Sequence, residues 1–215
     1  VSQFKNGEPD IVNNKTINEI IKIIVEMAQK NVLYLANDWS DYTDQAIQGD
    51  MVAGVMNGNW IIPTIKKVTD NKGKWAITTL PTLNGGEGYA SNGGSSLYVT
   101  SNCKNSDLAK KFLAYTFGGS TVTYDGALEK GGVITCCISA GKSDVYNQPD
   151  EYFNGQAIYA DIVEMGSHVQ VVEQSDFHYD ARSFIAPAII NIRDGADFDS
   201  EIENAEQQLR TKMGL

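Results

Sequence analysis

The amino-acid sequence predicts an α/β fold, and three observations support this class. The apolar run over 52–56 contains no polar residue, which is typical of a strand buried on both faces of a sheet. Over 17–28, apolar side chains recur at the spacing of an amphipathic helix. Helical and strand-like segments are mixed along the chain without strict alternation. This mixture predicts that the chain crosses between two lobes.

The first half of the chain begins with polar, turn-rich residues over 1–14, which predict a short hairpin or a loop. Thr16 and Glu19 form a capping-box pattern, so the first helix is expected to run from there to about Gln29. Shorter elements follow: a helix over 41–48 stopped at Gly49, a strand over 52–56, a helix over 61–68, a strand over 75–80 and a glycine-rich loop over 82–94.

The second half of the chain is predicted to be mostly helical. A strand is predicted over 95–100, and Ser106 is expected to cap a helix over 106–117. The remaining elements are a helix over 120–130, a loop-rich crossing over 135–154, a helix over 156–165, a strand over 169–172 and helices over 180–193 and 197–212. Pro187 predicts a bend in the helix over 180–193.

The composition argues against several kinds of partner and site. The 215 residues carry a net charge of −10, which would repel the phosphates of a nucleic acid. No apolar run approaches the roughly 20 residues of a membrane span. Two His and three Cys are scattered without ligand spacing, so neither a metal nor another cofactor is expected. Cys136 and Cys137 are expected to be free thiols, because a bridge between adjacent residues is strained.

Trp60 is the first candidate for contact with a ligand. It comes directly after the Asn57-Gly58 turn, at the carboxyl end of the strand predicted over 52–56. In open α/β sheets ligands bind at that edge, and a flat aromatic ring placed there can stack on a ligand. The alternative is that Trp60 belongs to the core, since tryptophan is highly buried on average.

Four segments, in this order, resemble those of bacterial extracellular solute-binding proteins. They are the apolar strand and Gly-x-Trp over 49–60, the strand ending in Leu-Pro over 74–81, the Gly-Gly-Ser strand over 92–99 and the helix over 105–113. The pattern is most similar to the carbohydrate-binding members, of the maltose type and of the arabinose or lactose type. The resemblance implies a fold of the type II periplasmic-binding-protein class.

The resemblance also implies a domain organisation. Family members are longer and carry a signal peptide and a further N-terminal half, so this chain is expected to be a C-terminal fragment of a longer precursor. Its opening residues, which lack Met and a signal peptide, also leave a cytoplasmic protein open. By analogy, residues 1–78 and 145–215 would form lobe two, 79–92 a hinge or linker, and 93–144 part of lobe one.

The function implied by the resemblance is capture of a sugar or oligosaccharide and its delivery to the membrane permease of an ABC importer. The protein would bind without catalysis, outside the cytoplasm, and the full-length precursor would be lipid-anchored. Two alternatives stay open, which are a glycoside-acting enzyme with two carboxylates, and a related binder of a polyamine, a phosphate or a metal. Self-association is expected if lobe one lacks its partner segments.

The resemblance further implies which residues contact the ligand. Trp60 matches the stacking tryptophan of the family. The segment of Gly93, Gly94 and Ser95 matches a loop that approaches the ligand, or it forms an ordinary turn. Asp180 lies in a late helix, where a surface salt bridge is the alternative to ligand contact. The other candidates are Tyr179 and Arg182 in that helix, and, with weaker support, Trp39 and Tyr89.

Overall fold

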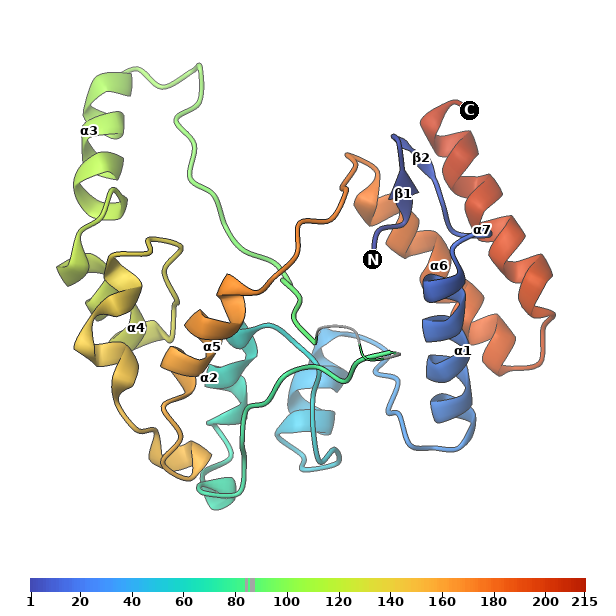
Figure 1. Cartoon of the computed structure of the whole chain (residues 1–215), viewed down its shortest axis with the longest axis horizontal. Coiled ribbons are helices and arrows are strands. Elements are labelled where there is room, and N and C mark those ends of the chain that lie inside the picture. The colour runs from blue at the N-terminus through green and yellow to red at the C-terminus, as the bar shows by residue number, and fades with distance from the viewer. Residues whose placement is uncertain (84, 86–87) are drawn as a thin grey trace. The chain divides into compact units, whose positions relative to one another are not determined.

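The chain divides into two compact units in a computed structural model that describes residues 1–83, 85 and 88–215 (Figure 1). Unit 1 comprises residues 1–37 and 171–215, and unit 2 comprises residues 38–170. The lobe boundaries expected from the sequence fall at other positions, after residues 78, 92 and 144. The assignment of lobes therefore stays a prediction.

Unit 1 begins with a β-hairpin, one of the two alternatives predicted for residues 1–14. Strands β1 (Phe4–Lys5) and β2 (Glu8–Pro9) pair in antiparallel register. The turn residues Asn6 and Gly7 have φ angles of 55° and 80°, as a tight two-residue turn requires. The Glu173 carboxylate accepts hydrogen bonds from both of their main-chain N–H groups, at 3.1 and 2.7 Å. A distant side chain therefore holds the turn.

Helix α1 (Lys15–Gln29) confirms the predicted amphipathic helix. Its buried positions recur every three or four residues along one face: Ile17, Ile21, Val25 and Ala28. Asn14 caps the helix, because its side-chain oxygen accepts from the main-chain N–H of Ile17 at 3.2 Å. The capping box predicted at Thr16 is wrong, since α1 already begins at Lys15 and Thr16 lies inside it.

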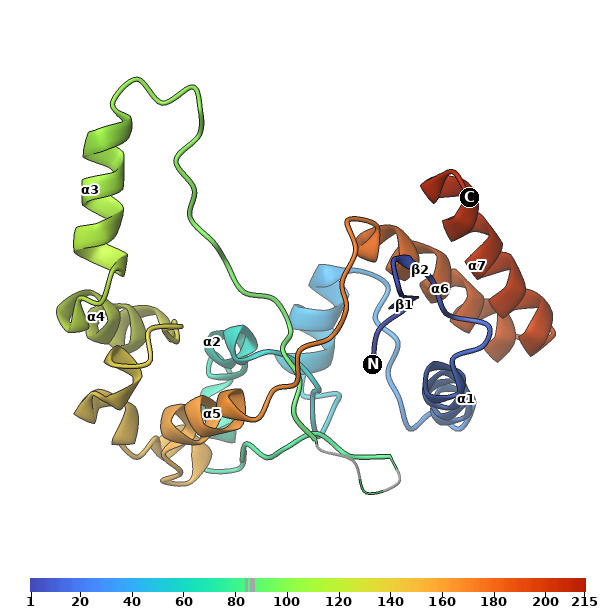
Figure 2. The same cartoon turned by 45° about the horizontal axis from the view of Figure 1, so that its top comes forward.

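Helices α6 (His178–Arg193) and α7 (Phe198–Met213) lie side by side in unit 1 (Figures 1 and 2), and they confirm the last two predicted helices. Asp197 caps α7 by accepting from the main-chain N–H of Ser200 at 2.9 Å. Pro187 lies inside α6, and the bend expected there stays a prediction. The core of unit 1 joins the hairpin to these helices through Phe4, Ile11, Ile17, Ile21, Val25, Ala181, Ile192, Ile202 and Leu209.

Glu206, on α7, is a buried carboxylate that binds the beginning of the chain. Its Oε2 accepts from the main-chain N–H groups of Ile11 and Val12, at 2.9 and 2.8 Å. Its Oε1 accepts from Arg210 Nε at 3.2 Å. The two N–H groups would be left without partners if the carboxylate were removed, and an unpaired buried donor is costly.

Unit 2 has its core around α2 (Ile62–Ile65) and α5 (Ile158–Ser167). A π-helical turn (Asp41–Ile47) and three 3₁₀ turns (Asn59–Ile61, Thr69–Asn71 and Glu151–Phe153) complete this part of the unit. The Tyr152 hydroxyl lies 2.7 Å from the carbonyl oxygens of both Ile65 and Val68. The short helices predicted over 41–48 and 61–68 are confirmed with shorter bounds. The core residues are Ile47, Ile61, Ile62, Ile65, Tyr152, Phe153 and Ile158.

Helices α3 (Ser106–Phe117) and α4 (Thr121–Gly131) confirm two further predictions. Ser120 caps α4 by accepting from the main-chain N–H of Thr123 at 3.3 Å. The cap predicted at Ser106 is wrong, because Ser106 is already the first helical residue of α3. The loop-rich crossing over 135–154 is confirmed and contains two more 3₁₀ turns, Ala140–Lys142 and Asp144–Asn147. Helix α5 begins two residues after its predicted start.

The strands predicted over 52–56, 75–80, 95–100 and 169–172 are wrong. Among the described residues, the one sheet is the β1–β2 hairpin. Extended backbone becomes a strand only where a neighbour offers matching N–H and C=O groups. At Ile77 a side chain takes this place, because the Gln156 amide binds its N–H and C=O at 2.9 and 2.8 Å. The result is a helix-rich protein that is compatible with the α/β class.

Helix α3 is unusual because none of its residues is buried. It lies at the end of a long extended segment, green in Figures 1 and 2. Phe112 and Tyr115 are 59% and 82% exposed, and Leu108 and Phe117 are exposed too. Part of the glycine-rich loop predicted over 82–94, before this segment, lies outside the described residues. A helix with this much exposed apolar surface favours association.

Replacing Glu206 with Ala is expected to destabilise unit 1 by about 2 kcal/mol, because the buried N–H of Ile11 and the half-buried N–H of Val12 lose their acceptor. Chemical denaturation followed by circular dichroism measures this loss. Glu206→Gln keeps one acceptor oxygen and is expected to cost less. Glu203→Ala, which removes an exposed carboxylate of the same helix, is the control and should change little. Equal stability of Glu206→Ala and the native chain would contradict the role given to the carboxylate.

The exposed face of α3 is expected to make the 215-residue chain self-associate. Light scattering coupled to size exclusion should show a dimer or a larger species. The double variant Phe112→Glu/Tyr115→Glu should shift the chain toward the monomer, because it replaces apolar surface with charge. Lys111→Glu, on the same helix, controls for the change of charge alone. A native chain that stays monomeric at high concentration would refute this expectation.

Candidate functional site

Three aromatic rings gather on the surface of unit 2. The ring centroids of Trp39 and Trp60 are 5.6 Å apart with an angle of 35° between the planes, and those of Trp39 and Tyr42 are 5.5 Å apart. Trp39 is 59% exposed and Trp60 is 43% exposed. These exposures exclude the interpretation of either tryptophan as a core residue. Neighbouring exposed indoles form a flat apolar surface on which a ligand can stack.

The segment that carries Trp39 is fixed by its own polar side chains. The Asp38 carboxylate accepts from the main-chain N–H of Asp41 at 2.8 Å. Thr43 is buried, and its hydroxyl donates to the Trp39 carbonyl at 3.0 Å. Ile47, four residues further on, belongs to the core of unit 2. The π-helical turn is thus anchored on its inner side, which leaves the Trp39 ring outside.

Trp60 is anchored in a similar way by the residues that follow it. Ile61 and Ile62 are buried in the core, and Trp60 occupies the exposed side of the same turn. The indole Nε1–H of Trp60 donates to the main-chain carbonyl of Asn92 at 3.0 Å. This bond joins two segments that are 32 residues apart in the sequence. It fixes the rotation of the indole ring within the site.

Asn57 and Asn92 connect the aromatic rings through their side-chain amides. Asn57 Oδ1 accepts from the main-chain N–H of Gly58 and from Asn92 Nδ2, both at 2.8 Å. Asn57 Nδ2 donates to the Tyr42 hydroxyl at 2.7 Å. The hydrogen-bond network therefore runs from Tyr42 through the two amides to Trp60, and it ties three separate segments together.

Two glycines allow these segments to approach closely. A Cβ atom on Gly58 would lie 2.5 Å from Trp60 Nε1 and 2.8 Å from the Asn92 carbonyl oxygen. A Cβ on Gly93 would lie 3.5 Å from Trp60 Nε1, and Gly93 has a φ of 89°. Gly58 is thus required by space and Gly93 by its backbone conformation.

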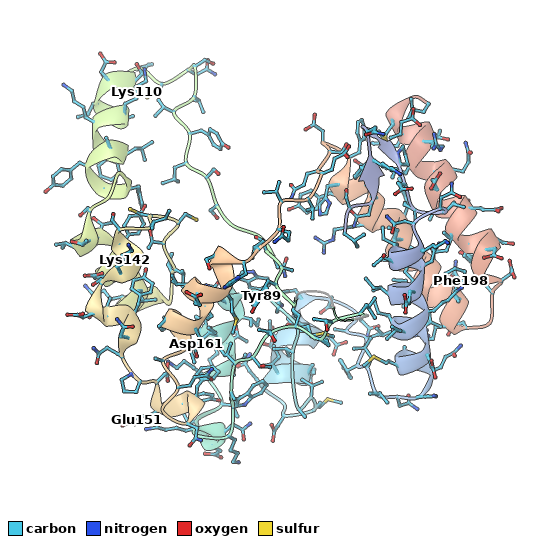
Figure 3. The ribbon with its side chains drawn as sticks, in the orientation of Figure 1. Tyr89, Lys110, Lys142, Glu151, Asp161 and Phe198 are labelled. Atoms are coloured by element: carbon cyan, nitrogen blue, oxygen red, sulfur yellow. The ribbon has the colours of Figure 1, made fainter. Side chains whose placement is uncertain are left out.

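The structure brings together three of the residues that the sequence predicted, Trp39, Trp60 and Gly93. Gly94 and Ser95 continue the exposed segment beyond Gly93. Tyr89, labelled in Figure 3, stacks on His168, with ring centroids 5.0 Å apart and an angle of 24° between the planes. Tyr89 thus has a partner of its own and does not belong to the tryptophan pair.

The candidates Tyr179, Asp180 and Arg182 lie at the start of α6 in unit 1. The Arg182 guanidinium carbon lies 5.7 Å from the Tyr179 ring centroid, a cation–π distance. The Asp180 carboxylate forms an ion pair with Lys212 of α7, at 3.7 Å. Asp180 thus has the neighbouring salt-bridge partner that was the alternative to ligand contact. Its role in binding stays a prediction.

Sequence reasoning missed Tyr42, Asn57 and Asn92. Asn57 was interpreted only as part of a turn, and Asn92 only as part of a glycine-rich loop and the start of the Gly-Gly-Ser segment. The signal that could have found them is the amide residue placed directly before glycine in both segments, Asn57-Gly58 and Asn92-Gly93. Such an amide can bond to the next main-chain N–H, as Asn57 does, and still reach a neighbouring segment.

The side chains that connect Trp60 to Tyr42 are neutral amides, whereas the segment of Trp39 also carries carboxylates. The nearby Asp44 carboxylate is engaged, because hydrogen bonds from Ser40 and then Thr43 lower its pKa. In the part of the chain that the structure describes, no three His, Cys, Asp or Glu side chains gather as a metal site. Cys103, Cys136 and Cys137 are free thiols, which was the prediction for Cys136 and Cys137. None of the helices described here is long and apolar enough to cross a membrane.

Comparison with known proteins identifies similar sequences. Residues 2–154 match the family model of bacterial extracellular solute-binding proteins. The chain is 27% identical over 206 residues to a lactose-binding protein of Rhizobium radiobacter. That alignment covers 95% of this chain and 49% of the relative. The chain thus spans about half the length of this curated relative.

Replacing Gly58 with Ala is expected to break the bond between Trp60 and Asn92, because the added Cβ overlaps the indole nitrogen and the carbonyl. Tryptophan emission of the ligand-free chain should change, and quenching by acrylamide should increase, while the circular-dichroism spectrum is kept. Gly54→Ala is the matched control, since a Cβ there meets open space. If both variants had the native emission spectrum, the close approach at Gly58 would be refuted.

Proposed function

This chain belongs to the bacterial extracellular solute-binding proteins, and we propose that it binds a carbohydrate as part of an ABC importer. The observation that carries the proposal is the exposed pair of Trp39 and Trp60, bordered by the amides of Asn57 and Asn92. The similarity to a lactose-binding protein supports a sugar as the ligand.

The chemistry of a sugar suits this arrangement. A pyranose ring has an apolar C–H face and a rim of hydroxyl groups. The face packs on an indole ring, and the hydroxyls need hydrogen-bond partners, since an unpaired buried polar group costs about 1–3 kcal/mol. Indole faces and neutral amides lie next to each other at this site. Sugar specificity would therefore depend on the polar rim and affinity on the tryptophans.

The wider role follows from the family. We propose a type II periplasmic-binding-protein fold, in which residues 79–92 act as a hinge and 93–144 and the remaining segments belong to different lobes. The protein would act outside the cytoplasm, as its extracellular family supports, with attachment by a lipid. It would deliver its sugar to the membrane subunits of the importer.

An enzymatic role has less support. The family and the similar protein are both named for binding. A glycosidase needs two carboxylates that flank the scissile bond. Around the tryptophan pair, Asn57 and Asn92 are amides, the Asp38 carboxylate accepts from the Asp41 main chain, and the Asp44 carboxylate is already bound by Ser40 and Thr43. The geometry therefore favours binding without chemistry.

Replacing Trp60 with Ala tests the proposal. Binding of lactose by the 215-residue chain, measured by calorimetry, is expected to weaken about tenfold or more, because the stacking surface is lost. The melting temperature should change little, since Trp60 is 43% exposed. Trp75→Ala is the control. It should lower the melting temperature, because Trp75 packs against the core of unit 2. A large loss of stability with unchanged affinity in Trp60→Ala would show a structural role instead.

A further inference from the structure

The hydrogen-bond directions of the amide network are fixed by one main-chain group. The N–H of Gly58 can only donate, so the Asn57 atom that faces it, at 2.8 Å, must be the oxygen. Asn57 Nδ2 then faces the Tyr42 hydroxyl, which must accept. Asn92 in turn must donate its Nδ2 to the same Asn57 oxygen. Each amide therefore has a determined orientation.

Several polar groups of the network remain available to a ligand. Asn57 Oδ1 already accepts two hydrogen bonds, and the Trp60 Nε1–H is used by the Asn92 carbonyl. One N–H of each amide, the Asn92 Oδ1 and the hydroxyl hydrogen of Tyr42 have no partner among the residues that the structure describes. Trp60 can therefore offer only its ring face, and the bordering residues must bind the hydroxyls.

We propose that Asn57 and Asn92 form an amide bracket that orients the Trp60 ring before the ligand arrives and that selects a neutral sugar by binding its hydroxyls. The proposal rests on the proposed function for its ligand. Its orienting role can be measured in the ligand-free chain.

The orienting role follows from how the indole is held. A surface tryptophan that rotates freely loses that freedom when a ligand stacks on it, which weakens binding. Here the Trp60 Nε1–H is bound by the main chain of Asn92, and the Asn92 side chain is bound by Asn57. The Gly58 backbone lies so close to the indole and the carbonyl that a Cβ there would overlap both. The Trp60 ring is thus oriented before the ligand binds, and the rotational entropy of its side chain is lost on folding rather than on binding.

The selective role follows from the free groups. They include both donors and an acceptor, and none carries a formal charge. A sugar hydroxyl both donates and accepts, so it can bond to each of them. An inorganic phosphate or a uronic acid would bring a charge that no cation of the bracket neutralises, and a polyamine would find no free carboxylate in it. The bracket therefore suits a neutral sugar better than these charged solutes.

The orienting role is tested in a chain with Trp39→Phe and Trp75→Phe, where Trp60 is the sole tryptophan. Asn92→Asp removes the donor to Asn57, and Asn57→Leu removes both the acceptor for Asn92 and the donor to Tyr42. Both variants are expected to raise the acrylamide quenching of Trp60 in the ligand-free chain. Asn59→Asp adds the same charge as Asn92→Asp, in the turn that carries Trp60. It is the matched control, and its quenching should equal that of the parent chain. Native quenching in both bracket variants would overturn the orienting role.

The selective role is tested by calorimetry on chains that keep all three tryptophans. The native chain should bind lactose more tightly than glucuronate, spermidine or inorganic phosphate. Asn92→Asp should weaken lactose binding about tenfold, since a hydroxyl loses a donor and meets a charge. Undiminished lactose affinity in Asn92→Asp, or a native preference for one of the charged solutes, would overturn selection by the bracket. If the native chain bound no sugar while quenching still depended on Asn92, the proposed function would fail and the orienting role would stand.

Discussion

A buried or half-buried main-chain N–H or C=O group must find a hydrogen-bond partner, and in this chain distant side chains provide many of them. Glu206 accepts from Ile11 and Val12, and Glu173 accepts from the hairpin turn. The Gln156 amide binds both polar groups of Ile77. In each case one side chain provides the hydrogen bonds that a neighbouring strand would provide in a sheet. The packing of both units depends on such bonds between segments far apart in the sequence.

The candidate site uses the same principle at the surface. The Asn92 carbonyl has the Trp60 indole as its partner, and the Asn57 oxygen has the Gly58 N–H. The hydrogen bonds that satisfy these main-chain groups thus also position the aromatic rings. The site is built from three segments around Trp39, Trp60 and Asn92, and none of them is part of a sheet. Its geometry therefore relies on side-chain hydrogen bonds and on the glycines that permit close approach.

The helices could be predicted from the sequence because their bonds are local. The spacing of apolar residues predicted α1, α3 and α7 close to their observed bounds, although the caps of α1 and α3 were misplaced. The predicted strands were wrong because a strand forms only beside a pairing partner, and the sequence does not show which segment that partner is. The same limit affects the site, where Trp60 was found from its position after a turn. Asn92 was missed, because its bond to Asn57 crosses 35 residues.

Stability alone does not account for the tryptophan surface. Two large indoles remain exposed, while a network of hydrogen bonds holds one of them in a single orientation. A purely structural tryptophan gains most from burial, and a freely rotating one would lose less entropy on folding. Exposure combined with fixed orientation is disadvantageous for folding and favourable for binding a flat apolar face. This combination, in a member of the solute-binding family, is the physical basis for proposing a ligand site at the two tryptophans.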